Sequence, residues 1–304
     1  MAKAGNSNTL TREYLDSILV EMRHIDSKVP NLDFTCFGHT FSTPITTAAL
    51  SHLDNCHPDG LVELARGAKA ANAMMWCGMG DDAELERIVA TGAKTVKIVK
   101  PYIDSDEVIR KIKHAEATGC IAVGIDIDHS FNHKGEYDVV LGYQMNCKSL
   151  AEIKTFVQST TLPFIVKGVL SVEDATKCLE AGVAGIVVSH HHGIMDFVIP
   201  PLMALPQILE VVGDKMKVFV DCSIESGMDC FKVLAMGATA PSVGRAVMLP
   251  LKKEGAQGAA NKIQEMSSGL AAAMARTGSL DLKGIAKDCL WVPTTYKKYS
   301  RKEA

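Results

Sequence analysis

The 304-residue sequence lacks several features that would assign it to a class at once. No apolar run reaches the roughly 18 to 20 residues that a membrane-spanning helix needs, and the amino terminus has no apolar signal-peptide centre. Lys and Arg number 32 against 35 Asp and Glu, so the basic surplus typical of nucleic-acid-binding proteins is missing. These absences predict a soluble, cytoplasmic protein that binds neither membranes nor nucleic acid.

The nine cysteines form no C-x-x-C pair, and the chain contains no G-x-G-x-x-G motif. An odd number of scattered cysteines is typical of reduced thiols in a protein core, and it favours neither a disulfide framework nor a zinc site. The missing glycine motif argues against a dinucleotide-binding fold, in which it opens the first helix.

Short apolar runs alternate with amphipathic stretches along most of the chain. A content of 47% hydrophobic and 22% charged residues supports a sizeable core. Most of the runs are apolar throughout, as strands covered on both faces should be. The predicted strands are 45–50, 73–78, 94–100, 121–128, 163–169, 185–189, 217–221 and 240–244. The predicted helices are 61–71, 82–90, 106–117, 150–159, 172–181, 203–212 and 228–236.

Eight β/α repeats over about 200 residues predict an α/β fold, a TIM (β/α)8 barrel. An open doubly wound sheet is the competing fold, but it usually has fewer strands and a Gly-rich first turn. We expect residues 1–304 to form one domain, with 1–40 as an amino-terminal extension and 256–304 as a carboxy-terminal helix and tail. The longest connection, 130–148, follows the fourth strand, where a loop usually lies over the active site.

Polar residues gather where the predicted strands end. In this fold catalytic groups lie at the carboxyl ends of the strands, and charges inside apolar strands are costly unless they are paired or solvated. Several such ends on one rim therefore predict a site. The residues concerned are Lys100, Asp126, Asp128, Lys167, Ser189 with His190, His191 and His192, then Asp221, Gly244 and Arg245.

Two of these ends invite a specific interpretation. Gly244 and Arg245 precede a helix at the place of the usual phosphate site of the barrel, where a guanidinium makes two hydrogen bonds to phosphate. The run His190–His192 suggests a metal, but adjacent residues on a strand point to opposite faces. Since no carboxylates stand at metal-ligand spacing, we predict no metal site.

The sequence resembles the FMN-dependent α-hydroxy-acid oxidase and dehydrogenase family. The segments that carry the resemblance are TREY (11–14), FGHTFSTPITTAAL (37–50), AEATGCIAVGIDID (115–128), LPFIVKGVLSVEDATKCLEAGVAGIVVSHHHG (162–193), VFVDCSIESGMDCFKVLAMGATAPSVGRAV (218–247) and TGSLDLKGIAKDCL (277–290). The resemblance covers most of the chain. It implies an FMN-dependent oxidoreductase that oxidises a small hydroxylated substrate, a 2-hydroxy acid or a related compound, and a homo-oligomer that is commonly a tetramer.

The resemblance also implies roles for individual residues. His191 is the base that takes the substrate hydroxyl proton during hydride transfer to flavin, and Asp128 orients it. Lys167 lies beside the flavin and stabilises its reduced form. The implied cofactor-binding residues are Ala48, Gly78, Asp126, Lys167, Ser189, Asp221, Ser223, Gly244 and Arg245, and the implied substrate-facing residues are Lys100, His190 and His192.

The sequence departs from the family pattern at the substrate and phosphate ends. The segment after His191 reads His192-Gly193-Ile194-Met195-Asp196, without the family arginine, and His129-Ser130-Phe131 stands where a second arginine is expected. Losing both removes a planar, bidentate grip on a carboxylate, which a lysine does not reproduce. Lys100, Lys134 and Arg23 are alternative anion contacts. At the phosphate loop, Glu225 replaces an arginine.

These departures leave three hypotheses. The first is an FMN-dependent dehydrogenase or oxidase with His191 as base. The second is an FMN enzyme with isomerase-like chemistry, which the altered carboxylate site motivates. The third is a non-catalytic barrel without flavin, which Glu225 motivates. The absorption spectrum of the purified protein distinguishes the third from the others.

Overall fold

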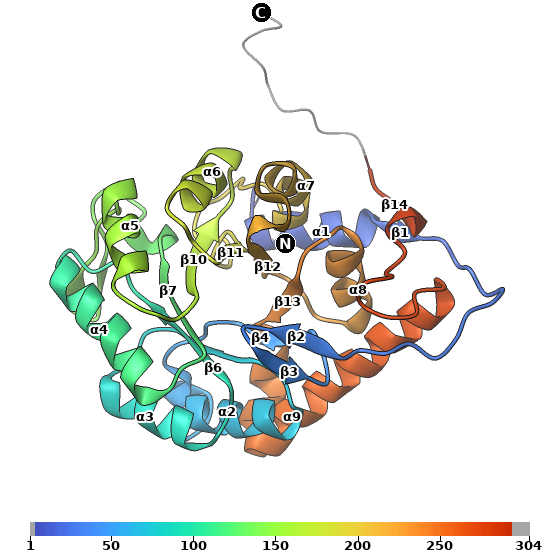
Figure 1. Ribbon diagram of the computed structural model, residues 1–304, viewed down its shortest axis with the longest axis horizontal. Coiled ribbons are helices and arrows are strands. Elements are labelled where there is room, and N and C mark those ends of the chain that lie inside the picture. The colour runs from blue at the N-terminus through green and yellow to red at the C-terminus, as the bar shows by residue number, and fades with distance from the viewer. Residues whose placement is uncertain (1–3, 294–304) are drawn as a thin grey trace, which may run out of the picture.

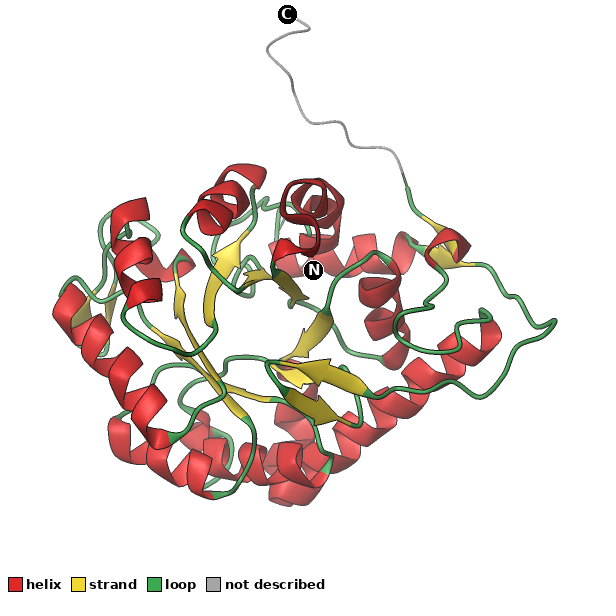
Figure 2. Ribbon diagram, in the orientation of Figure 1, coloured by secondary structure: helices red, strands yellow, loops and turns green. Residues whose placement is uncertain are grey.

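The structure, a computed structural model, describes residues 4–293. The predicted carboxy-terminal tail from residue 294 onward lies outside the described residues. Figure 1 shows a ring of strands surrounded by helices, and Figure 2 shows the same separation of strands inside from helices outside. None of the helices in 4–293 combines the length and the apolar character that crossing a membrane requires.

The central sheet is a (β/α)8 barrel, as predicted. Its eight strands are hydrogen-bonded in the order β4-β13-β12-β11-β10-β7-β6-β5. Leu50 bridges Cys77 in parallel and accepts a 2.8 Å hydrogen bond from the Gly78 amide, which closes the ring between β4 and β5. Each predicted strand contains one of these strands: β4 (Thr46–Thr47), β5 (Met75–Cys77), β6 (Thr95–Val99), β7 (Ala122–Asp126), β10 (Phe164–Val169), β11 (Gly185–Val188), β12 (Lys217–Val220) and β13 (Ala240–Val243).

The helices cover the outside of the barrel and agree with the sequence pattern to within a few residues. Seven of them are α2 (Gly60–Ala70), α3 (Asp82–Ala90), α4 (Ser105–Thr118), α5 (Leu150–Gln158), α6 (Val172–Glu180), α7 (Pro201–Val212) and α8 (Gly227–Ala235). Their starts follow local chemistry. Ser149 and Ser226, for example, each form a reciprocal capping box at the first turn of α5 and α8.

The helix α9 (Arg245–Arg276) is longer than the sequence predicts. Its backbone breaks at Gly255, where φ is 56° and ψ is −136°. The first part therefore serves as the eighth barrel helix, and the second part coincides with the predicted carboxy-terminal helix from residue 256. The break has a glycine because a positive φ strains residues that carry a Cβ. This arrangement places Arg245 at the first turn of a helix, directly beyond β13.

The amino-terminal extension contains elements that the sequence pattern does not reveal. They are α1 (Ser7–Ser17), β1 (Leu19–Val20) paired with β14 (Leu290–Trp291), and the hairpin of β2 (Phe34–Cys36) and β3 (His39–Phe41). The hairpin gives Phe34 and Phe41 to the cluster of Trp76, Ile98 and Phe219 inside the barrel. That cluster includes the starts of several strands, so the hairpin closes the amino-terminal end and leaves the carboxyl end for the site.

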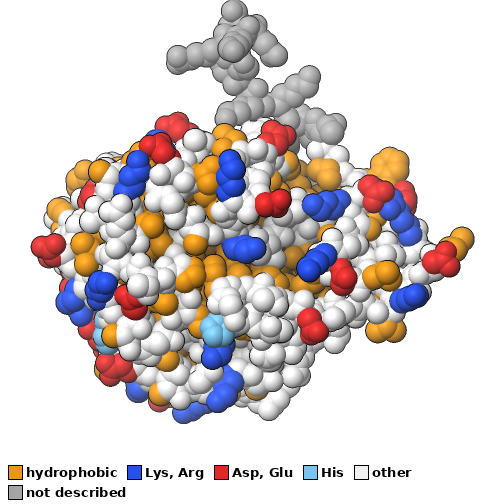
Figure 3. Space-filling view, viewed as in Figure 1, with side chains coloured by type: hydrophobic (Ala, Val, Ile, Leu, Met, Phe, Trp, Pro, Cys, Tyr) orange, Lys and Arg blue, Asp and Glu red, His pale blue; other side chains and the backbone are white. Residues whose placement is uncertain are grey.

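The connection after β7 holds the short helix η2 (Asp128–Ser130) and the hairpin of β8 (Val139–Val140) and β9 (Tyr143–Gln144). Three further short helices are η1 (Leu53–Asn55), η3 (Gly213–Lys215) and η4 (Lys287–Cys289). On the face shown in Figure 3, hydrophobic side chains gather across the middle, and charged side chains of both signs lie mostly toward the edge. This face therefore carries no patch of a single charge sign.

Candidate active site

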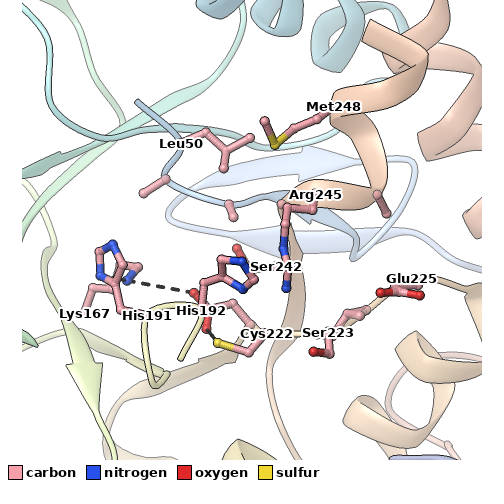
Figure 4. A pocket seen from close by; sticks show the side chains of 16 residues that line it. Leu50, Lys167, His191, His192, Cys222, Ser223, Glu225, Ser242, Arg245 and Met248 are labelled. Carbon is pink, nitrogen blue, oxygen red and sulfur yellow. Dashed lines mark hydrogen bonds and ion pairs between the residues drawn. The ribbon is translucent and has the colours of Figure 1, made fainter. Parts of the chain in front are cut away.

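A cavity of about 310 Å³ opens at the carboxyl ends of β4, β10, β11, β12 and β13. In Figure 4, Leu50 and Met248 lie on one side of it, Lys167 and His191 lie on the other, and Arg245 reaches in from the start of α9. Eight of the residues predicted for the site line the cavity: Ala48, Lys167, His191, His192, Asp221, Ser223, Gly244 and Arg245. Five strand ends that are distant in sequence therefore converge on this cavity, and the predicted residues at the ends of β6 and β7 do not reach its wall.

Lys167 lies buried at the centre of a group of acidic side chains. Its Nζ is 3.6 Å from Asp128 Oδ2, 4.0 Å from Asp221 Oδ2 and 3.0 Å from His191 Nδ1. Burial disfavours the charged ammonium, but Asp128, Asp126 and Asp221 outweigh it and hold the pKa of Lys167 above its usual range. The lysine therefore keeps its positive charge at the cavity wall.

His191 contacts Asp128 closely, since its Nδ1 is 2.6 Å from Asp128 Oδ1. Burial and the nearby charge of Lys167 lower the pKa of His191 to about 4. Burial and the charge of Asp126 raise the pKa of Asp128 well above its usual range, and its Oδ2 has no hydrogen-bond partner among the described residues. The imidazole is therefore neutral near pH 7 and free to accept a proton.

The backbone around this pair is strained. His191 has a φ of 46°, and its amide donates a 3.0 Å hydrogen bond to Ser189 Oγ, which holds the turn after β11. Next to Lys167, Gly168 has a φ of 97°, and the register of β10 against β11 shifts at this point. A Cβ on Gly168 would lie 2.5 Å from Asp128 Oδ2, so only glycine leaves Asp128 in place.

Asp126 and Lys100 form a buried ion pair next to the His191 pair. Lys100 Nζ is 2.7 Å from Asp126 Oδ2, and His191 Nδ1 is 3.4 Å from the same oxygen. Burial opposes the charge on Asp126, but Lys100 and Lys167 outweigh it and hold its pKa well below the usual range. Neither Lys100 nor Asp126 lines the cavity, so each acts on the site through its neighbours.

The ligand atoms of Asp126, Asp128 and His191 lie within 4.8 Å of one another, which is close enough for them to share a metal ion. In this structure the cations that face these carboxylates are the ammonium groups of Lys100 and Lys167. The two lysines therefore neutralise the carboxylates, and we do not propose a metal site here.

His190 and His192 point to different surroundings. His190 is buried, its Nε2 is 2.8 Å from Thr11 Oγ1, and its Nδ1 accepts a 2.8 Å hydrogen bond from the Gly193 amide. Both ring nitrogens are therefore used, away from the cavity. His192 lines the cavity, and its Nδ1 is 2.6 Å from Asn8 Oδ1.

Three other predicted residues have clear positions. Gly78 lies off the cavity wall and takes part in closing the barrel, where a Cβ would lie 2.4 Å from Ser51 Oγ. Arg23 pairs with Glu21 and Asp288 next to the β1–β14 sheet, and Lys134 lies on the exposed loop before β8. The structure therefore does not bring Arg23 or Lys134 into the cavity.

The opposite end of the cavity carries Arg245. Among residues 4–293, its guanidinium makes one hydrogen bond, from Nη2 to Asn8 Oδ1 at 3.3 Å, and Gly244, which has no side chain, stands at the N-cap of α9. Burial lowers the pKa of Arg245, while the neighbouring Glu225 opposes that shift. Donors from Arg245, Ser223 and the start of α9 thus face the cavity with one carboxylate beside them, an arrangement that suits an anion.

Sequence reasoning misses two contributions. Helix α1 supplies Asn8, which contacts His192 and Arg245, and Arg12, which binds Asp229 and the Ser223 carbonyl. The second is the pair of His129 and Asp138. His129 Nε2 is 3.1 Å from His191 Nε2, and His129 Nδ1 is 3.1 Å from Asp138 Oδ2. The sequence locates His129 only as the place of a missing arginine.

Comparisons with known proteins agree with this geometry. The chain matches the family described as FMN-dependent dehydrogenase over residues 1–153 and 146–292. Glycolate oxidase 3 of Arabidopsis thaliana is 28% identical over 93% of this chain and 85% of that protein. Glycolate oxidase of Spinacia oleracea is 27% identical over 93% and 86%.

Solved structures show the same similarity in three dimensions. A mandelate oxidase mutant with the monooxide FMN adduct superposes with a TM-score of 0.87 and 26% identity, over 96% of this chain and 93% of that chain. Mandelate oxidase with 3,3-difluoro-2-hydroxy-3-phenylpropionic acid gives a TM-score of 0.87 and 25% identity, over 96% and 91%.

Proposed function

The chain belongs to the FMN-dependent dehydrogenase family and is an FMN-dependent oxidoreductase, and we propose that its substrate is a small 2-hydroxy acid or a closely related hydroxylated compound. One observation carries the proposal. A neutral imidazole, His191, lies at the cavity wall 2.6 Å from Asp128 and 3.0 Å from the Lys167 ammonium. Glycolate and mandelate oxidases, which are similar to this chain, are named for 2-hydroxy acids.

The residues of the cavity fit FMN. Lys167 offers a permanent positive charge at one end, and Arg245, Ser223 and the start of α9 offer hydrogen-bond donors at the other. Ala48 and Gly244 present little or no side chain to the cavity between them, which leaves room for a flat ring system. When bound, FMN supplies the acceptor for the two electrons and the carbon-bound hydrogen that leave the substrate.

His191 and Asp128 handle the remaining proton. We assign His191 Nε2 as the atom that takes the substrate hydroxyl proton as the carbonyl forms, because Nδ1 is held by Asp128. Asp128 then stabilises the imidazolium, as a carboxylate does for a histidine base. Lys167 contributes positive charge at the cavity wall where negative charge develops during the reaction.

The side chains around His191 suit a small substrate that is bound without an arginine. Within residues 4–293, the cations near His191 are Lys100 and Lys167, and both are paired with carboxylates. We keep His192 as a substrate-facing residue because it lines the cavity. Lys100 acts through Asp126, and His190 supports the turn after β11.

We also propose that the protein is cytoplasmic and forms a homo-oligomer, commonly a tetramer in this family. Composition supports the first proposal, and the resemblance of the sequence supports the second. Cell fractionation tests the location, and light scattering of the purified protein tests the assembly. A monomeric mass in solution would overturn the second proposal.

The test of the function is the absorption spectrum of the purified, FMN-reconstituted protein during anaerobic addition of glycolate, (S)-mandelate and neutral diols. We expect flavin absorption that a 2-hydroxy acid bleaches. His191→Ala should retain the flavin and lose the bleaching, whereas the control His114→Ala, on α4 away from the cavity, should behave like the parent. Failure to take up FMN would favour a flavin-free barrel. Turnover of a substrate without net bleaching would favour isomerase-like chemistry.

A further inference from the structure

His129 lies against the base that the proposed function uses. It sits in η2, directly after Asp128, and its ring meets the ring of His191 edge to face, with centroids 4.2 Å apart and planes at 78°. The two Nε2 atoms are 3.1 Å apart. At its other end, His129 Nδ1 is 3.1 Å from Asp138 Oδ2. The groups thus form a chain in the order Asp138, His129, His191, Asp128.

The number of protons in this chain is constrained. If each carboxylate accepts a hydrogen bond from the adjacent Nδ1, both Nε2 atoms present lone pairs, and two lone pairs repel at 3.1 Å. The contact is a hydrogen bond only when one proton lies between the two Nε2 atoms. When His191 takes up a proton as the base of the reaction it becomes an imidazolium, and its Nε2–H then faces the lone pair of His129 Nε2. The proton that His191 takes up is therefore shared between the two rings.

We propose that His129 is the second proton carrier of the reaction, which receives from His191 Nε2 the proton that His191 takes from the substrate hydroxyl. The proposal rests on the proposed function. The substrate O–H bond breaks and an N–H bond forms on His191. After the product leaves, that N–H bond breaks and one forms on His129 Nε2, and water takes the proton. The electrons and the carbon-bound hydrogen follow the family's flavin chemistry, so no further reactant is needed.

The surroundings of His129 suit this role. Its side chain is 24% exposed, so a proton on the ring has a route to water, and Asp138 beside Nδ1 stabilises the imidazolium. The other charged groups that face the two rings are Lys100, Lys167, Asp126 and Asp221. Burial and the charge of Lys100 lower the pKa of His129, so the ring is neutral near pH 7 and able to accept.

A purely structural histidine would not need this geometry, and His190 provides the comparison within the same chain. Both nitrogens of His190 are taken by Thr11 and the Gly193 amide, and its ring lies away from the cavity. His129 uses one nitrogen for Asp138 and presents the other to the reacting atom of His191.

The first experiment compares two rates in the FMN-loaded parent, His129→Gln and Asp138→Asn, with His114→Gln as control. These are the single-turnover reduction of flavin by glycolate or (S)-mandelate and the steady-state rate with a dye as acceptor. We expect the steady-state rate of His129→Gln to fall about tenfold or more beyond any fall in the reduction rate. Asp138→Asn should show the same split more weakly. Added imidazole should restore turnover in His129→Ala.

Equal losses in the two rates, or unchanged turnover without imidazole rescue, would overturn the proposal, because His129 would then only position His191 or do nothing. Asp138→Asn keeps the ring and provides the test if His129→Gln does not fold. An absence of flavin reduction in the parent would refute the proposed function instead, which separates the two failures.

The second experiment needs no substrate. Proton NMR of the imidazole Cε1–H signals of the FMN-loaded enzyme follows the titration of His191 in the parent and in His129→Gln. Rings that share a proton titrate as a coupled pair, in two steps that both signals report. We expect two steps in the parent and a single step for His191 in the variant. A single, unchanged step in both proteins would contradict the shared proton.

Discussion

Asp128→Asn separates the activity of this site from its stability. The substitution keeps the size of the side chain but removes the acidic group whose Oδ1 lies 2.6 Å from His191 Nδ1. A hydrogen bond to a charged group contributes about 1.5–3 kcal/mol. If that contribution acts on the imidazolium that forms during the reaction, flavin reduction should slow by a factor of about 10 to 100, since each 1.4 kcal/mol is tenfold.

The stability of the same variant should not fall. Burial and Asp126 raise the pKa of Asp128 in the folded protein, so the native state disfavours the ionised carboxyl. Above the usual carboxyl pKa the parent is therefore destabilised by this group, and Asn removes the penalty. We expect the free energy of unfolding of Asp128→Asn to equal or exceed that of the parent at pH 7, with the difference vanishing in acid.

Asp126→Asn is the matched control, because the pKa of Asp126 is shifted in the opposite direction to that of Asp128. Lys100 and Lys167 hold the pKa of Asp126 below the usual range, so this carboxylate stabilises the fold above the usual carboxyl pKa, and the contribution is lost in acid. Its removal leaves Lys100 buried without its partner, 2.7 Å away, at a cost of about 3–5 kcal/mol.

The assays are stopped-flow bleaching of the flavin and urea denaturation at several pH values. A reduction rate of Asp128→Asn within twofold of the parent would refute the role of Asp128 in stabilising the imidazolium. If Asp128→Asn lost as much unfolding free energy as Asp126→Asn, the opposite pKa shifts of the two carboxyl groups would be refuted.

Four further substitutions test other parts of the site. Gly168→Ala should lower the free energy of unfolding by about 1–3 kcal/mol through strain at positive φ, and it should slow flavin reduction because the added Cβ would displace Asp128. Urea denaturation measures the first effect and stopped flow the second. An unaffected reduction rate would contradict the displacement of Asp128. Glu225→Gln should tighten FMN binding and Arg245→Ala should weaken it, as measured by flavin fluorescence. If both residues act on the phosphate of FMN, the binding of riboflavin, which has no phosphate, should change much less. His190→Phe should cost about 1–3 kcal/mol of unfolding free energy with little change in the reduction rate once FMN is bound, and a selective loss of reduction would instead place His190 at the substrate.

The barrel is well predicted from the sequence because its strands are buried on both faces. Apolar runs such as the one before Lys167 carry that burial in their composition, and the strands lie within the predicted ranges. Several short elements outside the barrel could not be predicted from the sequence. The strands of the β2–β3 hairpin are only three residues long, and α1 has few apolar residues; the hairpin packs into the cluster inside the barrel, and Leu15 of α1 is buried in the main core. Their existence depends on tertiary contacts that no local pattern contains.

The candidate site divides in the same way. Residues at strand ends, such as Lys167 and Asp221, can be placed on one rim because parallel strands carry their carboxyl ends to one edge. Asn8 could not be placed, since α1 reaches the cavity from the far end of the sequence. His190 and His192 look equivalent in sequence, yet positive φ values at His191 and His192 turn the chain so that only His192 faces the cavity.

The sequence by itself determined the eight-stranded barrel, the edge on which the polar groups lie and the residue types available there, because burial and strand direction are local and repeating properties. The tertiary structure alone decided which of those groups touch. Asp126 and Asp128, two residues apart, have opposite pKa shifts: Lys100 and Lys167 outweigh burial and lower the pKa of Asp126, whereas burial and the charge of Asp126 raise that of Asp128. The approach of His129 to His191 depends on the turn after β7 and on the strained turn after β11, and protonation depends on distances that only the folded chain sets.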